Sequence, residues 1–145
     1  MNIGEIFLRQ AATSLAISTT GRSLVEITRE VAGWVRDQAV DTGLLTVFCR
    51  HTSASLLIQE NAAREVPGDI IDWLNRIAPE DGGWQHDDEG PDDMPAHLKA
   101  ILTGVSLSIP VMGGDLALGT WQGIYLAEHR TRPHRRNIVL HLVGE

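Results

Sequence analysis

Two segments of the chain place apolar residues three or four positions apart, the spacing of an amphipathic helix. These predicted helices span residues 23–38 and residues 66–77. Ser23 and Glu26 have the spacing of a capping box at the start of the first helix, and Pro67 is tolerated in the first turn of the second. A third, short helix is predicted over residues 94–103, because Asp93 can cap its start and Gly104 can end it.

The remaining apolar segments have the length and composition of strands. The predicted strands are residues 5–20, 43–50, 105–112, 115–129 and 137–143, with residues 55–59 continuing the second of these. Gly113 and Gly114 fit a tight hairpin turn better than a phosphate-binding loop. Strands joined by such turns pair antiparallel, so we expect an α+β fold with a largely antiparallel sheet and two to three helices.

The composition is that of one ordinary globular domain, and we expect it to span residues 1–145. The 145 residues are 43% hydrophobic and 21% charged. The N-terminus has no basic segment followed by an apolar run, and no apolar run approaches the roughly 20 residues that span a bilayer. We therefore expect a cytoplasmic protein without membrane contact. Cys49 is the only cysteine, which excludes an internal disulfide and a CxxC motif, and we expect it to face the core.

The net charge of −7 comes from one segment of the chain. Seven acidic residues and no Lys or Arg lie between Glu80 and Asp93. Overall acidity argues against nucleic acid as a partner, because nucleic-acid binding needs a basic face. Four arginines nevertheless gather near the C-terminus and can hold an anionic group such as phosphate: Arg130, Arg132, Arg135 and Arg136. We expect this arginine cluster and the acidic loop to meet at one site.

Three of the six histidines are candidate metal ligands: His51, His86 and His97. Imidazole suits zinc and similar divalent metals, and three histidines with one open position are a common catalytic arrangement. The alternative is that each is an ordinary solvated or hydrogen-bonded histidine, since their spacing matches no local ligand motif. The nearby carboxylates can also hold Mg²⁺ together with a diphosphate: Asp87, Asp88, Asp92 and Asp93.

Two glutamates, Glu60 and Glu128, end strongly apolar segments. Partial burial at such a position raises the pKa of a carboxyl group and suits it to acid–base catalysis. The alternative is that each segment simply emerges into water there. Thr52 and Ser53 offer hydroxyl groups beside His51, but no aspartate completes a Ser-His-Asp pattern. Trp121 is either a core residue or a stacking platform for a flat heterocycle.

Several blocks of sequence, taken in order, resemble the YjbQ-like family, whose members are described as secondary thiamine-phosphate synthases. The resemblance covers essentially the whole chain. The blocks are His51-Thr52-Ser53-Ala54-Ser55, Gln59-Glu60-Asn61, Trp84-x-His86-Asp87, Asp92-Asp93-Met94-Pro95-Ala96-His97, Leu118-Gly119-Thr120-Trp121-Gln122-Gly123 and Glu128-His129-Arg130. The chain departs from the family at Trp84, where the family commonly has tyrosine, so any role of that hydroxyl group is lost here.

The resemblance implies a β-sandwich-like half-barrel with helices, assembled as a homotrimer. It implies that His51, His86 and His97 meet in one metal-binding pocket, at a subunit interface. It further implies the joining of a hydroxymethylpyrimidine diphosphate to a thiazole phosphate. On this hypothesis the catalytic residues are His51, Glu60, Glu128 and Arg130. The substrate-binding residues are Thr52, Ser53, Trp121, Gln122, Arg130 and Arg135.

Two other functions remain open at this point. The first is metal-dependent hydrolysis of a small phosphorylated metabolite, with Glu60 or Glu128 moving protons. The second is a trimeric module that binds a small anionic metabolite without turnover. Turnover assays with and without metal would separate the two enzymes from the binding module.

Overall fold

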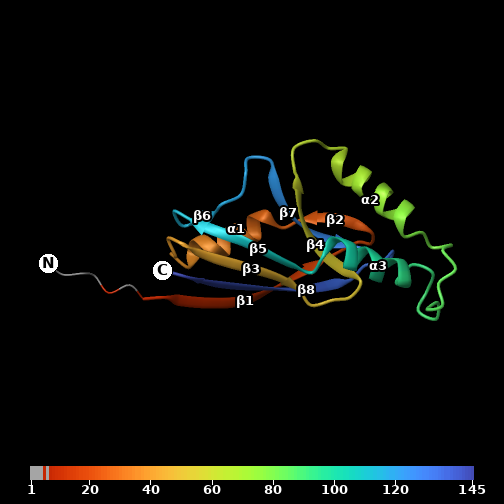
Figure 1. The fold of residues 1–145 in the computed structure, drawn as a ribbon, viewed down its shortest axis with the longest axis horizontal. Helices are drawn as coiled ribbons and strands as arrows, with labels where there is room; N and C mark the ends of the chain where they lie inside the picture. The colour runs from red at the N-terminus through yellow and green to blue at the C-terminus, as the bar shows by residue number, and fades with distance from the viewer. Residues whose placement is uncertain (1–4, 6) are drawn as a thin grey trace.

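The computed structural model describes residue 5 and residues 7–145, in which two antiparallel sheets pack with three helices (Figure 1). The five-stranded sheet has the order β1 (Arg9–Ser18), β8 (Arg135–Gly144), β3 (Gly43–Cys49), β5 (Ser106–Met112) and β6 (Asp115–Leu116). The three-stranded sheet has the order β2 (Ser23–Glu26), β7 (Gln122–Glu128) and β4 (Ala54–Glu60). The helices are α1 (Thr28–Asp37), α2 (Val66–Ile77) and α3 (Asp93–Thr103).

One hydrophobic core unites the two sheets and α1. Val47 and Leu140 lie opposite each other in the first sheet, Leu56 and Leu126 lie opposite each other in the second, and all four are fully buried. Val35 of α1 is buried in the same core. Alternate residues of a strand point to the same face, so this pairing fills the space between the sheets with apolar side chains. The predicted α+β fold with a curled, antiparallel half-barrel is confirmed.

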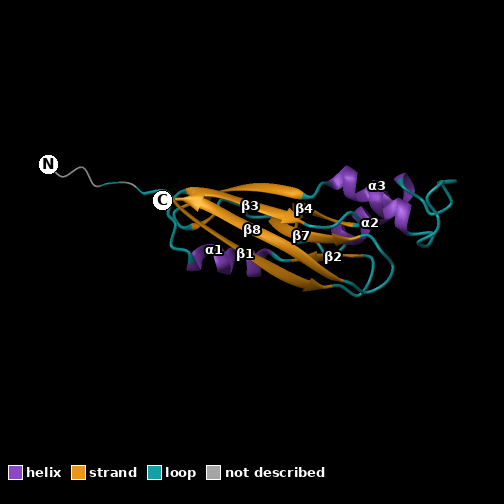
Figure 2. Cartoon of the chain, turned by 90° about the horizontal axis from the view of Figure 1, so that it is seen from below, coloured by secondary structure: helices purple, strands orange, loops and turns teal. Residues whose placement is uncertain are grey.

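Helices α2 and α3 lie at the end of the molecule opposite the C-terminus (Figures 1 and 2). Helix α3 packs against β4, and α2 packs against β2. Within the described residues, no helix is long and apolar enough to cross a membrane. The helical end of the molecule also contains most of the candidate site residues.

The predicted helix 23–38 is wrong in its first turn. Residues 23–26 form strand β2, which pairs with the end of β7, and the helix begins only at Thr28. The hydroxyl group of Ser23 donates to the carbonyl oxygen of Gly21 instead of capping a helix. Strand pairing with β7 satisfies the backbone groups of this segment, and this tertiary contact outweighs the local capping pattern.

Residues 55–59 also differ from the expectation, because they do not continue β3. A turn at residues 50–53 takes the chain from β3 to β4, which belongs to the other sheet. The long segment 115–129 is divided as well, into the short β6 and β7 with a loop between them.

The other elements agree with the predictions, except that Asp93 is the first residue of α3 and does not cap it: the N-cap is Asp92, and no described side chain makes a capping hydrogen bond there. Helix α2 has Pro67 in its first turn, and α3 ends before Gly104. Gly113 and Gly114 form the β5–β6 hairpin turn with φ of 59° and 82°. Strand β1 lies within the predicted segment 5–20, of which residue 6 is outside the described residues. Cys49 is buried in the core as expected.

Candidate metal centre and adjoining cavity

Four ionisable side chains converge at the start of α3, and together they have the composition of a metal site. They are His86, Glu89, Asp93 and His97, and each offers one ligand atom within 4.8 Å of the others. Asp93 and His97 lie one helical turn apart, so their side chains share one face of α3. His86 and Glu89 come from the preceding acidic loop. Imidazole nitrogen and carboxylate oxygen are the donor types that zinc and similar divalent metals accept.

Oδ2 of Asp93 is the centre of this cluster. It lies 2.7 Å from Nε2 of His86 and 3.0 Å from Nε2 of His97. The hydrogen bond with Asp93 raises the pKa of His86 above its usual value. Burial alone would raise the pKa of Asp93, but its hydrogen bond with His86 and the charges around it hold that pKa below the usual value.

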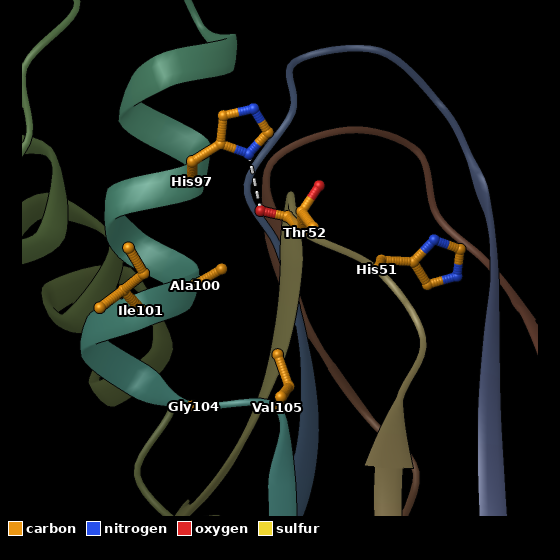
Figure 3. A pocket seen from close by; sticks show the side chains of 7 residues that line it. All are labelled: His51, Thr52, His97, Ala100, Ile101, Gly104 and Val105. Atoms are coloured by element: carbon orange, nitrogen blue, oxygen red, sulfur yellow. Dashed lines mark hydrogen bonds between the residues drawn. The ribbon is translucent and has the colours of Figure 1, made fainter.

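The backbone of Thr52 fixes the orientation and the tautomer of His97. Nδ1 of His97 donates to the carbonyl oxygen of Thr52 over 2.8 Å (Figure 3). A carbonyl oxygen only accepts, so the proton of the neutral ring is on Nδ1 and the lone pair of Nε2 faces Oδ2 of Asp93. Nε2 of His97 and Oδ2 of Asp93 both carry lone pairs and lie 3.0 Å apart, so a cation must lie between or beside them, either an additional proton or a metal ion. The four side chains therefore fit as ligands of a divalent metal.

Arg130 holds the carboxylates of this cluster in place. Its Nη1 donates to Oδ1 of Asp93 over 2.7 Å, its Nε donates to Asp92 over 2.9 Å, and its Nη2 donates to the carbonyl oxygen of Glu89. Burial opposes the charge on Asp92, yet hydrogen bonds from Thr131 and Arg130 lower its pKa to about 2. The predicted meeting of the acidic loop with the arginine cluster is thus confirmed at Arg130. All three nitrogens of Arg130 are engaged by the protein itself, in contrast to the expected role as a phosphate ligand.

Glu128 forms a buried ion pair with Arg136 beneath the turn at residues 50–53. Glu128 is 1% exposed, and it accepts hydrogen bonds from Arg136, from the hydroxyl of Thr19 and from the backbone N–H of Arg130. Burial raises the pKa of Glu128, but these hydrogen bonds outweigh burial and leave the pKa below its usual value. The expectation of a raised pKa is therefore wrong. Arg136 also donates to the carbonyl oxygen and hydroxyl of Ser53, so this pair supports the turn that orients His97.

His51 lies on the other side of that turn. Its ring points away from His97 and toward β8 (Figure 3), where Nε2 accepts a 2.8 Å hydrogen bond from the backbone N–H of Asn137. Burial, followed by the charge of Arg136, lowers the pKa of His51. The structure therefore brings together His86 and His97 of the predicted ligands, and within the described residues Glu89 and Asp93 complete the cluster in place of His51.

The other predicted residues lie away from the metal cluster in this chain. Arg135 is exposed at the start of β8. Glu60 and Gln122 lie opposite each other at one end of the β4–β7 pair, and Trp121 is next to them, 62% exposed. Ala54 and Glu128 form the other end of the pair, beside the cluster. The two ends of the seven-residue strand β4 are about 20 Å apart.

A cavity of about 600 Å³ adjoins the cluster through His97. Its walls are mostly apolar and come from α3, from the residues after α3 and from the turn at residues 50–53 (Figure 3). The lining residues are His51, Thr52, His97, Ala100, Ile101, Gly104 and Val105. The sequence pattern does not predict this cavity, and it does not predict Glu89 as a metal ligand. The only local sequence signal for the cluster is the spacing of its members, three residues from His86 to Glu89 and four from Asp93 to His97.

Comparison with known proteins shows which sequences this chain resembles. A family model described as UPF0047 protein YjbQ-like matches residues 13–145. A UPF0047 protein of Synechocystis sp. is 49% identical over 138 residues and covers 94% of each chain. UPF0047 protein YjbQ of Escherichia coli is 41% identical over 133 residues, which are 91% of this chain and 96% of that one.

Solved structures show the same fold. A YbjQ-like protein of unknown function from Sulfolobus solfataricus superposes with a TM-score of 0.89 at 26% identity, over 96% of this chain and all of that one. An uncharacterised protein of the YjbQ/UPF0047 family from Clostridium acetobutylicum superposes with a TM-score of 0.82 at 36% identity, over 88% and 97% of the two chains.

Proposed function

Because the chain belongs to the YjbQ-like UPF0047 family, we propose that it is a divalent-metal-dependent enzyme acting on a small phosphorylated metabolite. The proposed ligands are His86, Glu89, Asp93 and His97. The observation that carries the proposal is the contact between Nε2 of His97 and Oδ2 of Asp93. The Thr52 carbonyl oxygen holds the Nδ1 proton of His97, so a metal ion satisfies both facing acceptors at once.

The residues around the ligands support the same proposal. Metal-binding histidines usually donate their second N–H to a carbonyl or carboxylate oxygen, and His97 does so to Thr52. Metal-binding carboxylates are in turn hydrogen-bonded, as Asp93 is by Arg130. Two imidazoles in the set favour Zn²⁺ or a similar transition metal over Mg²⁺. The metal would neutralise negative charge that develops on a phosphate leaving group.

The reaction that we propose first is the one that the family resemblance implies. In it, the thiazole nitrogen bonds to the methylene carbon of the pyrimidine diphosphate, the carbon–oxygen bond breaks, and diphosphate leaves. Arg130 and Arg136 already pair with Asp92, Asp93 and Glu128. Charge on the leaving diphosphate would therefore be neutralised mainly by the metal ion that His86, Glu89, Asp93 and His97 would hold, rather than by these two arginines.

Metal binding is the first test. We expect equilibrium dialysis of the purified protein against Zn²⁺ or Mn²⁺ to give about one ion per chain. His86→Ala and His97→Ala should each weaken binding at least tenfold, because each removes one of four ligands. His51→Ala and His141→Ala are matched controls outside the cluster and should keep the ion. Full metal content in the His86→Ala and His97→Ala variants would refute the proposed site.

Turnover is the second test, and it separates the candidate reactions. Metal-loaded and metal-stripped protein are incubated with hydroxymethylpyrimidine diphosphate, with and without thiazole phosphate. Formation of thiamine phosphate only with both substrates and metal identifies the synthase. Metal-dependent release of phosphate or diphosphate without thiazole phosphate identifies a hydrolase. Metal binding with neither product contradicts the enzymatic proposal and favours the binding module.

A further inference from the structure

We infer that the cavity beside the metal cluster binds the uncharged ring of the substrate, while an oxyanionic head group reaches the metal at His97. The inference rests on the proposed metal site and specifies the class of molecule that it takes: one flat or aliphatic ring with one metal-binding head. The cavity volume of about 600 Å³ is within the usual range of small-molecule sites.

One face of α3 carries both the proposed metal ligands and part of the apolar wall of the cavity. Asp93 and His97 supply metal ligands, and Ala100, Ile101 and Gly104 continue the same face at intervals of three or four residues. In Figure 3 His97 lies at one end of the cavity, with Ala100 and Ile101 along its wall. A helix rises 1.5 Å per residue, so these apolar residues begin about 5 Å from His97 and end about 10 Å from it. That distance suits a single ring attached directly to its head group.

The chemistry of the wall determines which part of the substrate enters. Among the lining residues there is no Lys, Arg, Asp or Glu. A phosphate group inside the cavity would lose its hydration without gaining a cation, which is strongly unfavourable. The head group must therefore stay at the His97 end, where the metal ligands are, and only an uncharged ring suits the interior.

Two further features of the cavity favour binding of that ring: open space at Gly104 and exposed apolar surface at Ile101. Gly104 ends α3 with φ of 98°, and a Cβ atom built there would meet no other atom within 4 Å, so the space beside its backbone is open. Ile101 is 78% exposed at the rim. A ring in the cavity would cover this side chain and remove apolar surface from water.

A matched pair of hydroxamates tests the inference. Benzohydroxamate and acetohydroxamate have the same metal-binding head, but only the first has a ring. We expect calorimetry on the metal-loaded protein to show benzohydroxamate binding about tenfold or more tightly, because its ring buries apolar surface in the cavity. Metal content is measured after each titration to confirm that neither probe removes the ion. Equal affinities for the two probes would overturn the inference.

A pair of neighbouring variants locates the ring. Ile101→Gln replaces an exposed wall residue of the cavity, and Leu102→Gln makes the same change beside it, in the groove between α2 and α3. We expect Ile101→Gln to remove most of the preference for benzohydroxamate while metal content and acetohydroxamate affinity stay unchanged. Leu102→Gln should alter none of these. An unchanged preference in Ile101→Gln would overturn the inference while leaving the metal site intact, whereas a protein that takes up no metal would overturn both proposals.

Discussion

Arg130 would support the proposed metal site without touching the metal itself. It donates to Asp92, Asp93 and the carbonyl oxygen of Glu89, so it fixes two of the four proposed ligands. Partners of this kind typically contribute 10–100-fold to metal affinity. We therefore expect Arg130→Ala to weaken Zn²⁺ binding about 10-fold or more in a dialysis titration. Arg132→Ala, which changes an exposed arginine of the same loop, is the control. Unchanged Zn²⁺ affinity in Arg130→Ala would contradict this role.

His129 is a second residue whose role depends on hydrogen bonding, and it is only 2% exposed. The hydroxyl of Thr103 donates to the carbonyl oxygen of Lys99, so Thr103 accepts the proton of Ser55. Nε2 of His129 must then donate to Ser55, over 2.7 Å. This series of hydrogen bonds joins the end of α3 to β4 and to the residue after β7. It uses His129 in its neutral form.

The buried, neutral state of His129 makes stability depend on pH. Burial, followed by the charge of Lys99, lowers its pKa from 6.5 to about 3. Between those values the unfolded chain binds a proton that the native state does not, so the free energy of unfolding falls as pH falls below 6.5. One proton corresponds to about 1.4 kcal/mol per pH unit.

Urea unfolding between pH 6.5 and pH 4.5 measures this effect. We expect the free energy of unfolding to fall more steeply with decreasing pH in the wild type than in His129→Gln. The two slopes should differ by about 1.4 kcal/mol per pH unit, which corresponds to one proton. Glutamine keeps an N–H donor for Ser55 but does not titrate. The difference between the two proteins cancels the contribution of the carboxylates. Equal slopes would show that His129 does not stay neutral in the native state.

At the scale of elements, the sequence correctly predicts those helix ends and turns that depend on local interactions alone. The end of α3 at Gly104 and the Gly113–Gly114 turn follow from backbone conformations that glycine favours. Ser23 and Glu26 have the local pattern of a helix start, but pairing with β7 makes them a strand. His51 follows β3, and nothing in its neighbourhood tells whether the turn directs its ring toward α3 or toward β8. The ligand set could therefore be predicted only in part.

Two glycines test the balance between backbone conformation and packing in the helices. Gly104 has φ of 98°, a conformation that other residues adopt only with strain, whereas Gly33 lies within α1 and a Cβ there would meet no atom within 4 Å. We expect Gly104→Ala to lower the free energy of unfolding by about 1–3 kcal/mol. Gly33→Ala should raise it by about 0.5–1 kcal/mol, because alanine loses less backbone entropy. Denaturant unfolding of both variants measures these changes, and a shift of the same sign in the two would contradict the argument.

At the scale of the whole molecule, the residues that the family resemblance groups into one site lie at two ends of the chain's fold. The candidate metal cluster is at the α3 end, and Glu60, Trp121 and Gln122 are at the other end of β7, about 20 Å away. One chain therefore supplies two separate groups of polar side chains. An assembly of several chains is the simplest way for both groups to contribute to one site.

The outer face of the five-stranded sheet supplies a physical reason for assembly. Leu44 and Phe48 of β3 and Val143 of β8 are 44%, 42% and 37% exposed, although their neighbours Leu45, Val47 and Leu142 are buried in the core. The described helices pack instead against β2, β4, β6 and β7. Covering these large apolar side chains with a second copy removes apolar surface from water and so lowers the free energy. We expect this face to form the contact between copies.

The prediction is a homotrimer, with a mass about three times the 15.9 kDa of the chain. Light scattering at micromolar concentration measures that mass directly. Phe48→Lys places a charge on the outer face without changing the core, so we expect it to shift the mass toward one chain. Arg29→Lys, which preserves the charge of a residue on α1 away from this face, should leave the mass unchanged. A wild-type mass of a single chain would contradict the trimer, and a Phe48→Lys variant that still assembles would place the contact on another surface.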